Sequence, residues 1–148
     1  TTNTLTSCAT KRAAQARVVY CIEPLSRHET RLVNTVEEAA AVIRAIDSPA
    51  VRTMIDCSAA GQAEAVPVAD LVRRWVPTGL IGHIHFNDPN RRGPGEGTMA
   101  FAPILAALAA AKYLGDAAIE PFIYEPDGPT CAARRIGYLR GLIEAGNT

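Results

Sequence analysis

The 148-residue chain lacks an excess of charge of either sign, because 15 Lys and Arg residues balance 15 Asp and Glu residues. This balance excludes a nucleic-acid-binding protein that relies on a basic surface, and it also excludes an acidic tail. No apolar run approaches the ~18 residues that a membrane-spanning helix needs. The segment Thr1–Thr10 is polar and lacks the apolar core of a signal peptide. We therefore expect a cytoplasmic protein with a poorly ordered tail over residues 1–10.

The chain also lacks any pair of cysteines with the C-x-x-C spacing of redox and zinc sites. Its four cysteines are Cys8, Cys21, Cys57 and Cys131. Two of them lie inside apolar, strand-like runs, which favours buried free thiols in a reducing compartment.

What the chain does contain is a regular alternation of strand-like and helix-like segments. Four short runs are dense in Val, Ile, Tyr and Phe and predict strands at Arg17–Glu23, Val51–Asp56, Ile81–Phe86 and Ala117–Phe122. A helix-like segment follows each strand, at Thr35–Ile46, Gln62–Trp75, Phe101–Lys112 and Cys131–Glu144. Thr35 and Glu38 have the spacing of a capping box at the start of the first helix. The predicted apolar face of the second helix consists of Val66, Leu71, Val72 and Trp75.

The predicted strands begin at residues 17, 51, 81 and 117, so that one β-α unit repeats along the chain. Strands joined in this way run parallel, and we expect a single α/β domain over residues 1–148. Eight such units form a (β/α)8 barrel, so four predict half of a barrel. The competing architecture, an open doubly wound sheet, usually has a Gly-rich turn after its first strand. Here the first strand is followed by PLSR (24–27), which favours the half barrel.

Charged or metal-competent residues occur at the ends of all four predicted strands. They are Glu23, Asp56, the pair His83 and His85 followed by Asn87 and Asp88, and Glu120. In a parallel α/β fold these ends meet at one open mouth, and a buried carboxylate there needs a partner or a metal ion. Three carboxylates and one imidazole suit Mn2+, Mg2+ or Co2+ better than structural zinc. The alternative is that arginines such as Arg27 and Arg91 neutralise the carboxylates.

A Gly-rich, basic loop, Asn87–Gly97, follows the third strand with the sequence NDPNRRGPGEG. Its spacing matches neither the P-loop nor the dinucleotide-binding motif. Two interpretations stay open, a plain turn-rich loop and a loop that binds substrate through Arg92. Arg91 is the better candidate for contacting an oxyanion or a hydroxyl group.

Three segments carry a resemblance to a known family: IEPLSRHE (22–29), GHIHFNDPNRRGPGEG (82–97) and IEPFIYEPDGP (119–129). Together they resemble the sugar isomerases and epimerases of the xylose-isomerase-like barrel superfamily, and within it the D-tagatose/D-psicose 3-epimerase group. The resemblance extends over residues 17–145. It implies that these residues form the last four β-α units of the barrel.

The resemblance also implies a site. One divalent metal ion, most often Mn2+, would be bound by Glu23, Asp56, His85 and Glu120, since the second histidine of the H-x-H pattern is the ligand in that family. Arg91 and Glu29 are implied to contact the substrate. A family histidine three residues after the Asp ligand is replaced by Ala59 here, so one substrate contact is missing or replaced.

Three functional hypotheses follow. In the first, implied by the resemblance, a metal-dependent ketose isomerase or epimerase uses Glu23 and Glu120 to take and return a proton through an ene-diolate. In the second, the chain is a truncated, catalytically inactive relative that keeps the fold and metal binding, as Ala59 suggests. The third, a DNA-repair endonuclease of the same superfamily, needs many histidines for its zinc ions, and the chain has three.

The half barrel also leads to an expectation about assembly. A four-stranded sheet leaves the two runs 17–23 and 117–122 as open edges, and proteins normally cover such edges. The inner face would be bare as well, because all strands of a barrel fill its interior. We therefore expect a homodimer in which two half barrels close on each other, with a small sugar as the other partner.

Overall fold

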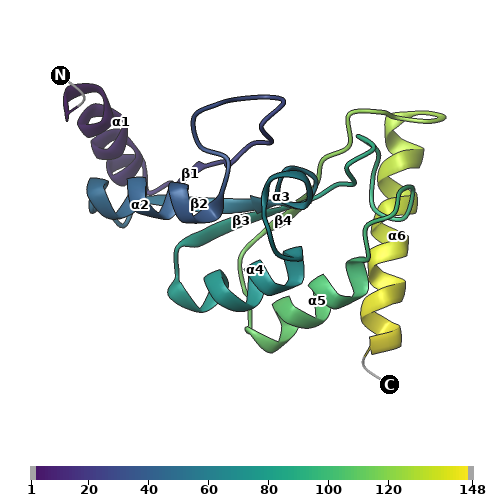
Figure 1. Ribbon diagram of the computed structural model, residues 1–148. Coiled ribbons are helices and arrows are strands. Elements are labelled where there is room, and N and C mark those ends of the chain that lie inside the picture. Colours follow the sequence, from purple (N-terminus) through teal and green to yellow (C-terminus); the bar gives the residue numbers. More distant parts are fainter. Residues whose placement is uncertain (1–2, 147–148) are drawn as a thin grey trace.

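Four parallel strands form a single sheet with the order β1-β2-β3-β4 in the computed structural model, which describes residues 3–146 (Figure 1). The strands are β1 (Tyr20–Ile22), β2 (Val51–Asp56), β3 (Ile81–Phe86) and β4 (Ala117–Ile119). The helices are α1 (Asn3–Ala16), α2 (Val36–Ile46), α3 (Cys57–Ala63), α4 (Val68–Trp75), the 3-10 turn η1 (Val76–Thr78), α5 (Phe101–Ala110) and α6 (Gly128–Gly146). The predicted α/β fold of four parallel β-α units is confirmed.

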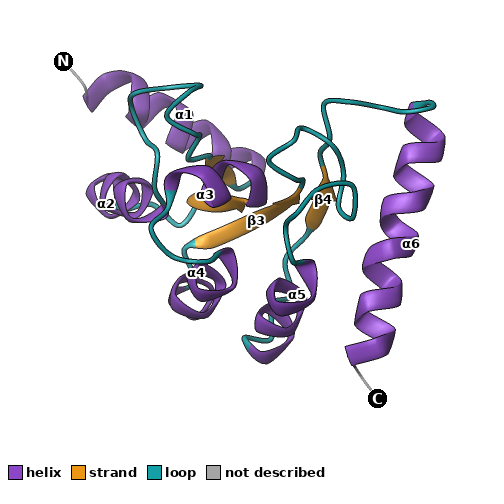
Figure 2. Ribbon diagram, turned by 45° about the vertical axis from the view of Figure 1, so that its right-hand side comes forward, coloured by secondary structure: helices purple, strands orange, loops and turns teal. Residues whose placement is uncertain are grey.

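Four helices, α2, α4, α5 and α6, follow one another along one side of the sheet (Figure 2). Figure 2 shows α2, α4, α5 and α6 in an arc around the strands, and α4 packs on α5 as α5 packs on α6. Between this arc and the sheet lies the hydrophobic core, with Ile55, Leu71, Ile84 and Phe101 almost completely buried. The opposite face of the sheet carries the polar residues of the strand ends.

The N-terminal region begins with a helix in the described part of the chain. Helix α1 spans Asn3–Ala16, and the first strand is shorter than the predicted run Arg17–Glu23. Arg17 has a left-handed backbone (φ 55°), and the amide of Val18 donates to the carbonyl of Ala13. These two residues therefore terminate the helix, since their backbone groups are used for its C-terminal cap.

The predicted helix Gln62–Trp75 is wrong, because the structure has two helices in this region. Helix α3 begins directly after β2, where the Asp56 side chain accepts a hydrogen bond from the amide of Ala59. Helix α3 ends at Ala63, and Pro67, which has no amide hydrogen to continue a helix, is the N-cap residue of α4. As a result Val66 lies between the helices and is 45% exposed, whereas Leu71, Val72 and Trp75 are buried as predicted.

Nearby hydrogen bonds and a proline set the start of α2, the end of β4 and the start of α6. Thr35 and Glu38 form the predicted capping box of α2. Strand β4 ends before Pro121, after which the amides of Phe122 and Ile123 donate to the carbonyl of Arg91. Helix α6 starts earlier than predicted, and Asp127 accepts hydrogen bonds from Thr130.

The four cysteines are free thiols, but the expected burial holds only for Cys57 and Cys131, since Cys21 is half-buried and Cys8 is exposed. Burial raises the pKa of the Cys57 thiol far above its usual value. Within residues 3–146, none of the helices is long and apolar enough to cross a membrane.

Candidate metal centre

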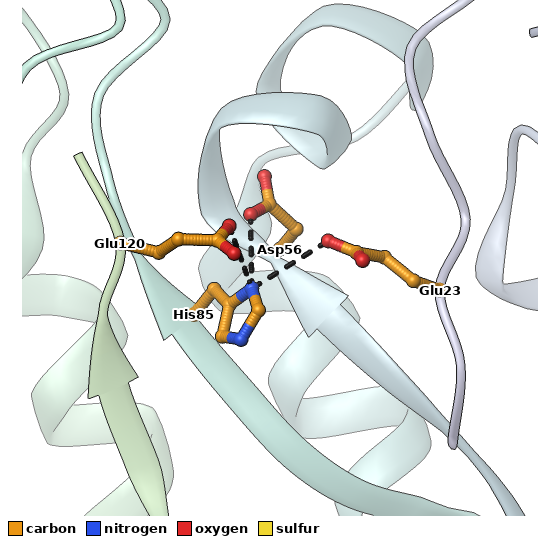
Figure 3. Close-up of side chains that lie close together, drawn as sticks. All are labelled: Glu23, Asp56, His85 and Glu120. Atoms are coloured by element: carbon orange, nitrogen blue, oxygen red, sulfur yellow. Dashed lines mark ion pairs between the residues drawn. The ribbon is translucent and has the colours of Figure 1, made fainter. Parts of the chain in front are cut away.

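Four side chains from four consecutive strands meet at the carboxyl end of the sheet (Figure 3). Glu23 and Glu120 each follow the last residue of an edge strand, while Asp56 ends β2 and His85 lies near the end of β3. One donor atom from each residue lies within 4.8 Å of the others. The Nδ1 atom of His85 lies 2.9 Å from a Glu120 oxygen and 3.5 Å from oxygens of both Glu23 and Asp56. The structure therefore brings together the four residues that the sequence predicted as ligands.

Sheet register explains why these side chains share one face. Asp56 is the partner of His85 in the β2–β3 pairing, and His85 is in turn the partner of Ala118 in β4. Paired residues of neighbouring parallel strands point to the same side of a sheet, and so do residues two apart. Glu120, two residues after Ala118, therefore lies on the same face as His85.

His85 provides the clearest sign that the cluster suits a cation. Its Nδ1 atom is buried and makes no hydrogen bond of acceptable geometry, although three carboxylates surround it. The carboxylates of Asp56 and Glu23 raise the pKa of His85 to about 10 against the opposing effect of burial. Three oxygen donors and one imidazole nitrogen around a common point are a donor set that fits a divalent ion.

The other two histidines lie outside this cluster. The ring of His83 packs edge-to-face on His85 with centroids 4.9 Å apart, and burial lowers the pKa of His83. His28 lies on the loop after β1 and lines the cavity next to the cluster. The multi-histidine site of the endonuclease hypothesis has no counterpart in the described part of the chain, where Glu23, Asp56, His85 and Glu120 form the one metal-competent group.

The carboxylates of the cluster have different environments. The Asp56 side chain is only 5% exposed, whereas those of Glu23 and Glu120 are 32% and 40% exposed. Burial raises the pKa of Glu120, and the negative charges of Glu23 and Asp56 act in the same direction against the nearby His85. Figure 3 shows Glu23 and Glu120 approaching His85 from opposite sides, with Asp56 between them.

A cavity of about 120 Å³ adjoins the cluster. Glu29 and Arg91, the two predicted substrate contacts, both line it, and their charged groups are 4.0 Å apart. Ser26 holds the Glu29 carboxylate with its backbone amide and its hydroxyl group. The Arg91 guanidinium stacks on the ring of Phe122, 4.2 Å from its centroid. Arg91 thus faces the cavity and does not form an ion pair with the four-residue cluster.

Arg92, the alternative anchor of a substrate-binding loop, has other partners. It forms an ion pair of 2.7 Å with Glu125 and lies 4.0 Å from Glu96, which in turn contacts the buried Arg135 of α6. These contacts attach the loop Asn87–Gly97 to the C-terminal helix, and Arg92 does not line the cavity. Of the two interpretations left open by the sequence, the structure favours a turn-rich, structural loop at Arg92.

Sequence reasoning named Asn87 among the polar residues at the strand ends but assigned it no partner, and it did not identify Ser26. Asn87 lies two residues after His85, donates to Asp56 and is buried. The available signal was that a polar residue two positions after His85 points to the same face of the sheet as His85. This signal does not identify the partner, because a residue just after a strand can contact many other residues. Ala59, at the position where the resemblance implies a histidine, is buried and lines the cavity together with Gln62 one turn later.

The fold and this site define a class of protein: parallel β-α units with a metal-competent carboxylate-histidine cluster at the carboxyl ends of the strands. The sequence matches the family described as xylose isomerase-like TIM barrel over residues 4–142. The chain therefore belongs to the xylose isomerase-like TIM barrel family.

Several named proteins are similar to the chain. A D-psicose 3-epimerase of Enterocloster bolteae is 35% identical over 115 residues, which are 78% of this chain and 37% of that protein. One of Agrobacterium fabrum is 35% identical over 103 residues, or 70% of this chain and 35% of its own length. The crystal structure of 3-keto-D-glucoside 4-epimerase from E. coli superposes with a TM-score of 0.82 at 27% identity, covering 91% of this chain and 50% of that one. The chain thus spans half or less of the length of these relatives.

Proposed function

We propose that this chain carries the metal centre of a sugar epimerase that acts on the carbon beside a carbonyl group. The observation that supports the proposal most strongly is the convergence of Glu23, Asp56, His85 and Glu120 around one point. The names of the similar proteins add to it. Epimerisation at C3 of D-psicose and epimerisation at C4 of a 3-keto-glucoside each invert a carbon next to a ketone. The named reactions of these relatives therefore belong to one reaction type.

The cluster fits a divalent ion, and Mn2+ is the ion we propose, with Mg2+ and Co2+ as alternatives. Glu23, Asp56, His85 and Glu120 would hold it. A bound divalent ion supplies Lewis-acid polarisation of the substrate oxygens and stabilises the negative charge of an ene-diolate.

The two glutamates at the edges of the cluster would move the proton. Glu23 and Glu120 approach His85 from opposite sides (Figure 3). This arrangement would allow one carboxylate to act on each face of a flat substrate bound between them. One carboxylate oxygen would remove the proton from the carbon beside the carbonyl group. The other glutamate, protonated, would return a proton to the opposite face, so that the configuration is inverted.

The cavity residues would orient the sugar. Arg91 and Glu29 line the space next to the cluster and offer a guanidinium donor and a carboxylate acceptor to hydroxyl groups. Phe122 holds the Arg91 guanidinium against its ring, which limits the number of side-chain conformations that Arg91 samples.

A relative that binds metal without turnover is the second candidate, and Ala59 is the observation that favours it. Its methyl group lines the cavity at the position where the resemblance implies a histidine. One experiment separates the two candidates. The Mn2+-loaded chain is incubated in D2O with D-psicose, D-tagatose and a 3-keto-glucoside, and NMR follows deuterium incorporation beside the carbonyl group.

Epimerisation with solvent deuterium at the inverted carbon, lost in Glu23→Gln and Glu120→Gln, is the expected outcome. A chain that binds Mn2+ but exchanges no proton with any of these sugars would favour the binding-only alternative. The relatives' substrates serve here as a test panel, because the sugar of this chain is not defined by the four ligands.

We also propose a homodimer. Strands β1 and β4 are the two edges of the sheet, and large apolar side chains beside them are exposed, among them Val18, Val19, Tyr20 and Phe122. Exposed strand edges favour association. Light scattering at micromolar concentration should give twice the chain mass, and a clean, soluble monomer would contradict this assembly.

A further inference from the structure

Asn87 lies directly after β3 and is 1% exposed. Its side chain spans from the metal centre to the first turn of α3. The Nδ2 atom donates a hydrogen bond to Asp56 Oδ2 at 2.6 Å, and the Oδ1 atom accepts one from the amide of Ser58 at 2.8 Å. Both polar atoms of this buried side chain are therefore used.

The partners fix the orientation of the amide group. The Ser58 amide can only donate, so it must be paired with the carbonyl oxygen of Asn87. The opposite orientation would place the Asn87 oxygen against the Asp56 carboxylate and the NH2 group against the Ser58 amide hydrogen, and both contacts would be repulsive. The NH2 group is consequently directed at Asp56.

The oxygen of Asp56 that receives this hydrogen bond is the one that faces the cluster. Asp56 Oδ2 lies 3.5 Å from His85 Nδ1, while Oδ1 accepts the hydrogen bond from the amide of Ala59 at 2.7 Å. The carboxylate is therefore held at both oxygens, by the helix at one and by Asn87 at the other. It is also the least exposed carboxylate of the cluster.

We propose that Asn87 is a positioning residue of the metal centre, which directs Asp56 Oδ2 toward the ion by its hydrogen bond. This inference rests on the proposed metal-binding function. Since a carboxylate keeps a second lone pair on an oxygen that accepts one hydrogen bond, Asp56 Oδ2 can accept from Asn87 and bind a cation at the same time. Loss of such a hydrogen bond to a ligand typically lowers metal affinity 10- to 100-fold.

A purely structural role is the competing explanation, because Asn87 also satisfies an amide of the first turn of α3. The two roles make different predictions for the folded, metal-free protein. A structural role lowers the stability of Asn87→Ala and leaves the Mn2+ dissociation constant of the folded chain unchanged. A positioning role raises that dissociation constant.

The test is calorimetric titration with Mn2+ of the purified chain, of Asn87→Ala and of Asn87→Leu, with urea unfolding of each metal-free protein recorded in parallel. Asn87→Leu preserves most of the side-chain volume, so it is the variant to measure if Asn87→Ala does not fold. Thr35→Ala is the matched control, because it removes a helix cap of α2 away from the cluster.

The expected result is a dissociation constant raised about 10- to 100-fold in both Asn87 variants and changed less than twofold in Thr35→Ala. Asn87 variants that fold and bind Mn2+ as tightly as the unmodified chain would overturn the positioning role. If the unmodified chain itself takes up no Mn2+, the proposed function fails instead, so the two failures are distinguishable.

Discussion

The outer and inner faces of β2 and β3 differ sharply in composition, although the residues alternate along the same two strands. On the outer face, Ile55, Ile84 and Phe86 are buried in the hydrophobic core under the helices. On the inner face, Asp56 and His85 belong to the four-residue cluster. Because successive side chains point to opposite faces, each strand can contribute to the core and to the site at once.

This separation has a consequence for variants. Substitutions on the inner face should change metal binding and leave the core intact, and substitutions on the outer face should do the reverse. The residues Ile55 and Asp56, or Ile84 and His85, are neighbours in sequence, so each pair compares the two faces at nearly the same place in the fold.

The largest expected effect is on the inner face. Glu120→Gln removes a charged ligand and should weaken Mn2+ binding more than about 100-fold, since loss of a ligand's hydrogen-bond partner alone costs up to that factor. Metal content after dialysis measures the effect. Glu125→Gln is the matched control, because Glu125 is exposed and pairs with Arg92 outside the cluster. Unchanged metal stoichiometry in Glu120→Gln would rule out the site as described.

The corresponding change on the outer face is Ile84→Ala. Ile84 is completely buried, so the cavity should lower the free energy of unfolding by about 2–5 kcal/mol. Urea denaturation measures the loss, and Mn2+ affinity of the folded variant should stay within twofold. Weakened metal binding at an unchanged free energy of unfolding would mean that the two faces are not independent.

A smaller effect is expected beside the cluster, in the cavity. Arg91→Ala should lower kcat/KM about 10- to 100-fold, the range for a lost hydrogen bond to a charged group, while the bound metal stays constant. Steady-state kinetics and metal analysis of the same preparation test it. Loss of the metal instead would show that Arg91 shapes the cluster rather than the substrate pocket.

The smallest effect belongs to a helix end far from the inner face. Thr35→Ala removes the side-chain acceptor of the α2 capping box and should destabilise the chain by about 1 kcal/mol. Thermal unfolding with and without Mn2+ checks the value, and the stabilisation by the ion should equal that of the unmodified chain. A larger loss of stability would point to a disturbance beyond the cap.

The two central strands and their site residues could be predicted from the sequence. In β2 and β3, the apolar residues that indicate a strand lie directly beside the polar residues that form the site. Both strands have the predicted bounds, and the polar residues at the strand ends meet because parallel strands in register bring their carboxyl ends together. The capping box of α2 could also be predicted, because Thr35 and Glu38 are only three residues apart. These features depend on residues that are close in sequence or on the regular repeat of the β-α unit.

Other features depended on contacts that the sequence does not display. Helix α1 is terminated by Arg17, which has a left-handed backbone, and by Val18, whose amide donates to a helix carbonyl. The sequence pattern instead predicted both residues to begin a strand. Asn87 acquires its partners Asp56 and Ser58 only when β3 packs beside β2 and α3. Pro67 was a visible interruption, and the periodicity of the apolar residues around it hid the break between α3 and α4.

The position of a bound ion tests the central claim most directly. Crystals grown with Mn2+ and measured at the manganese absorption edge should show one anomalous peak among Glu23, Asp56, His85 and Glu120, at bonding distance from a donor atom of each. A peak bound by other residues, or no peak in crystals of the folded chain soaked in excess Mn2+, would contradict the account.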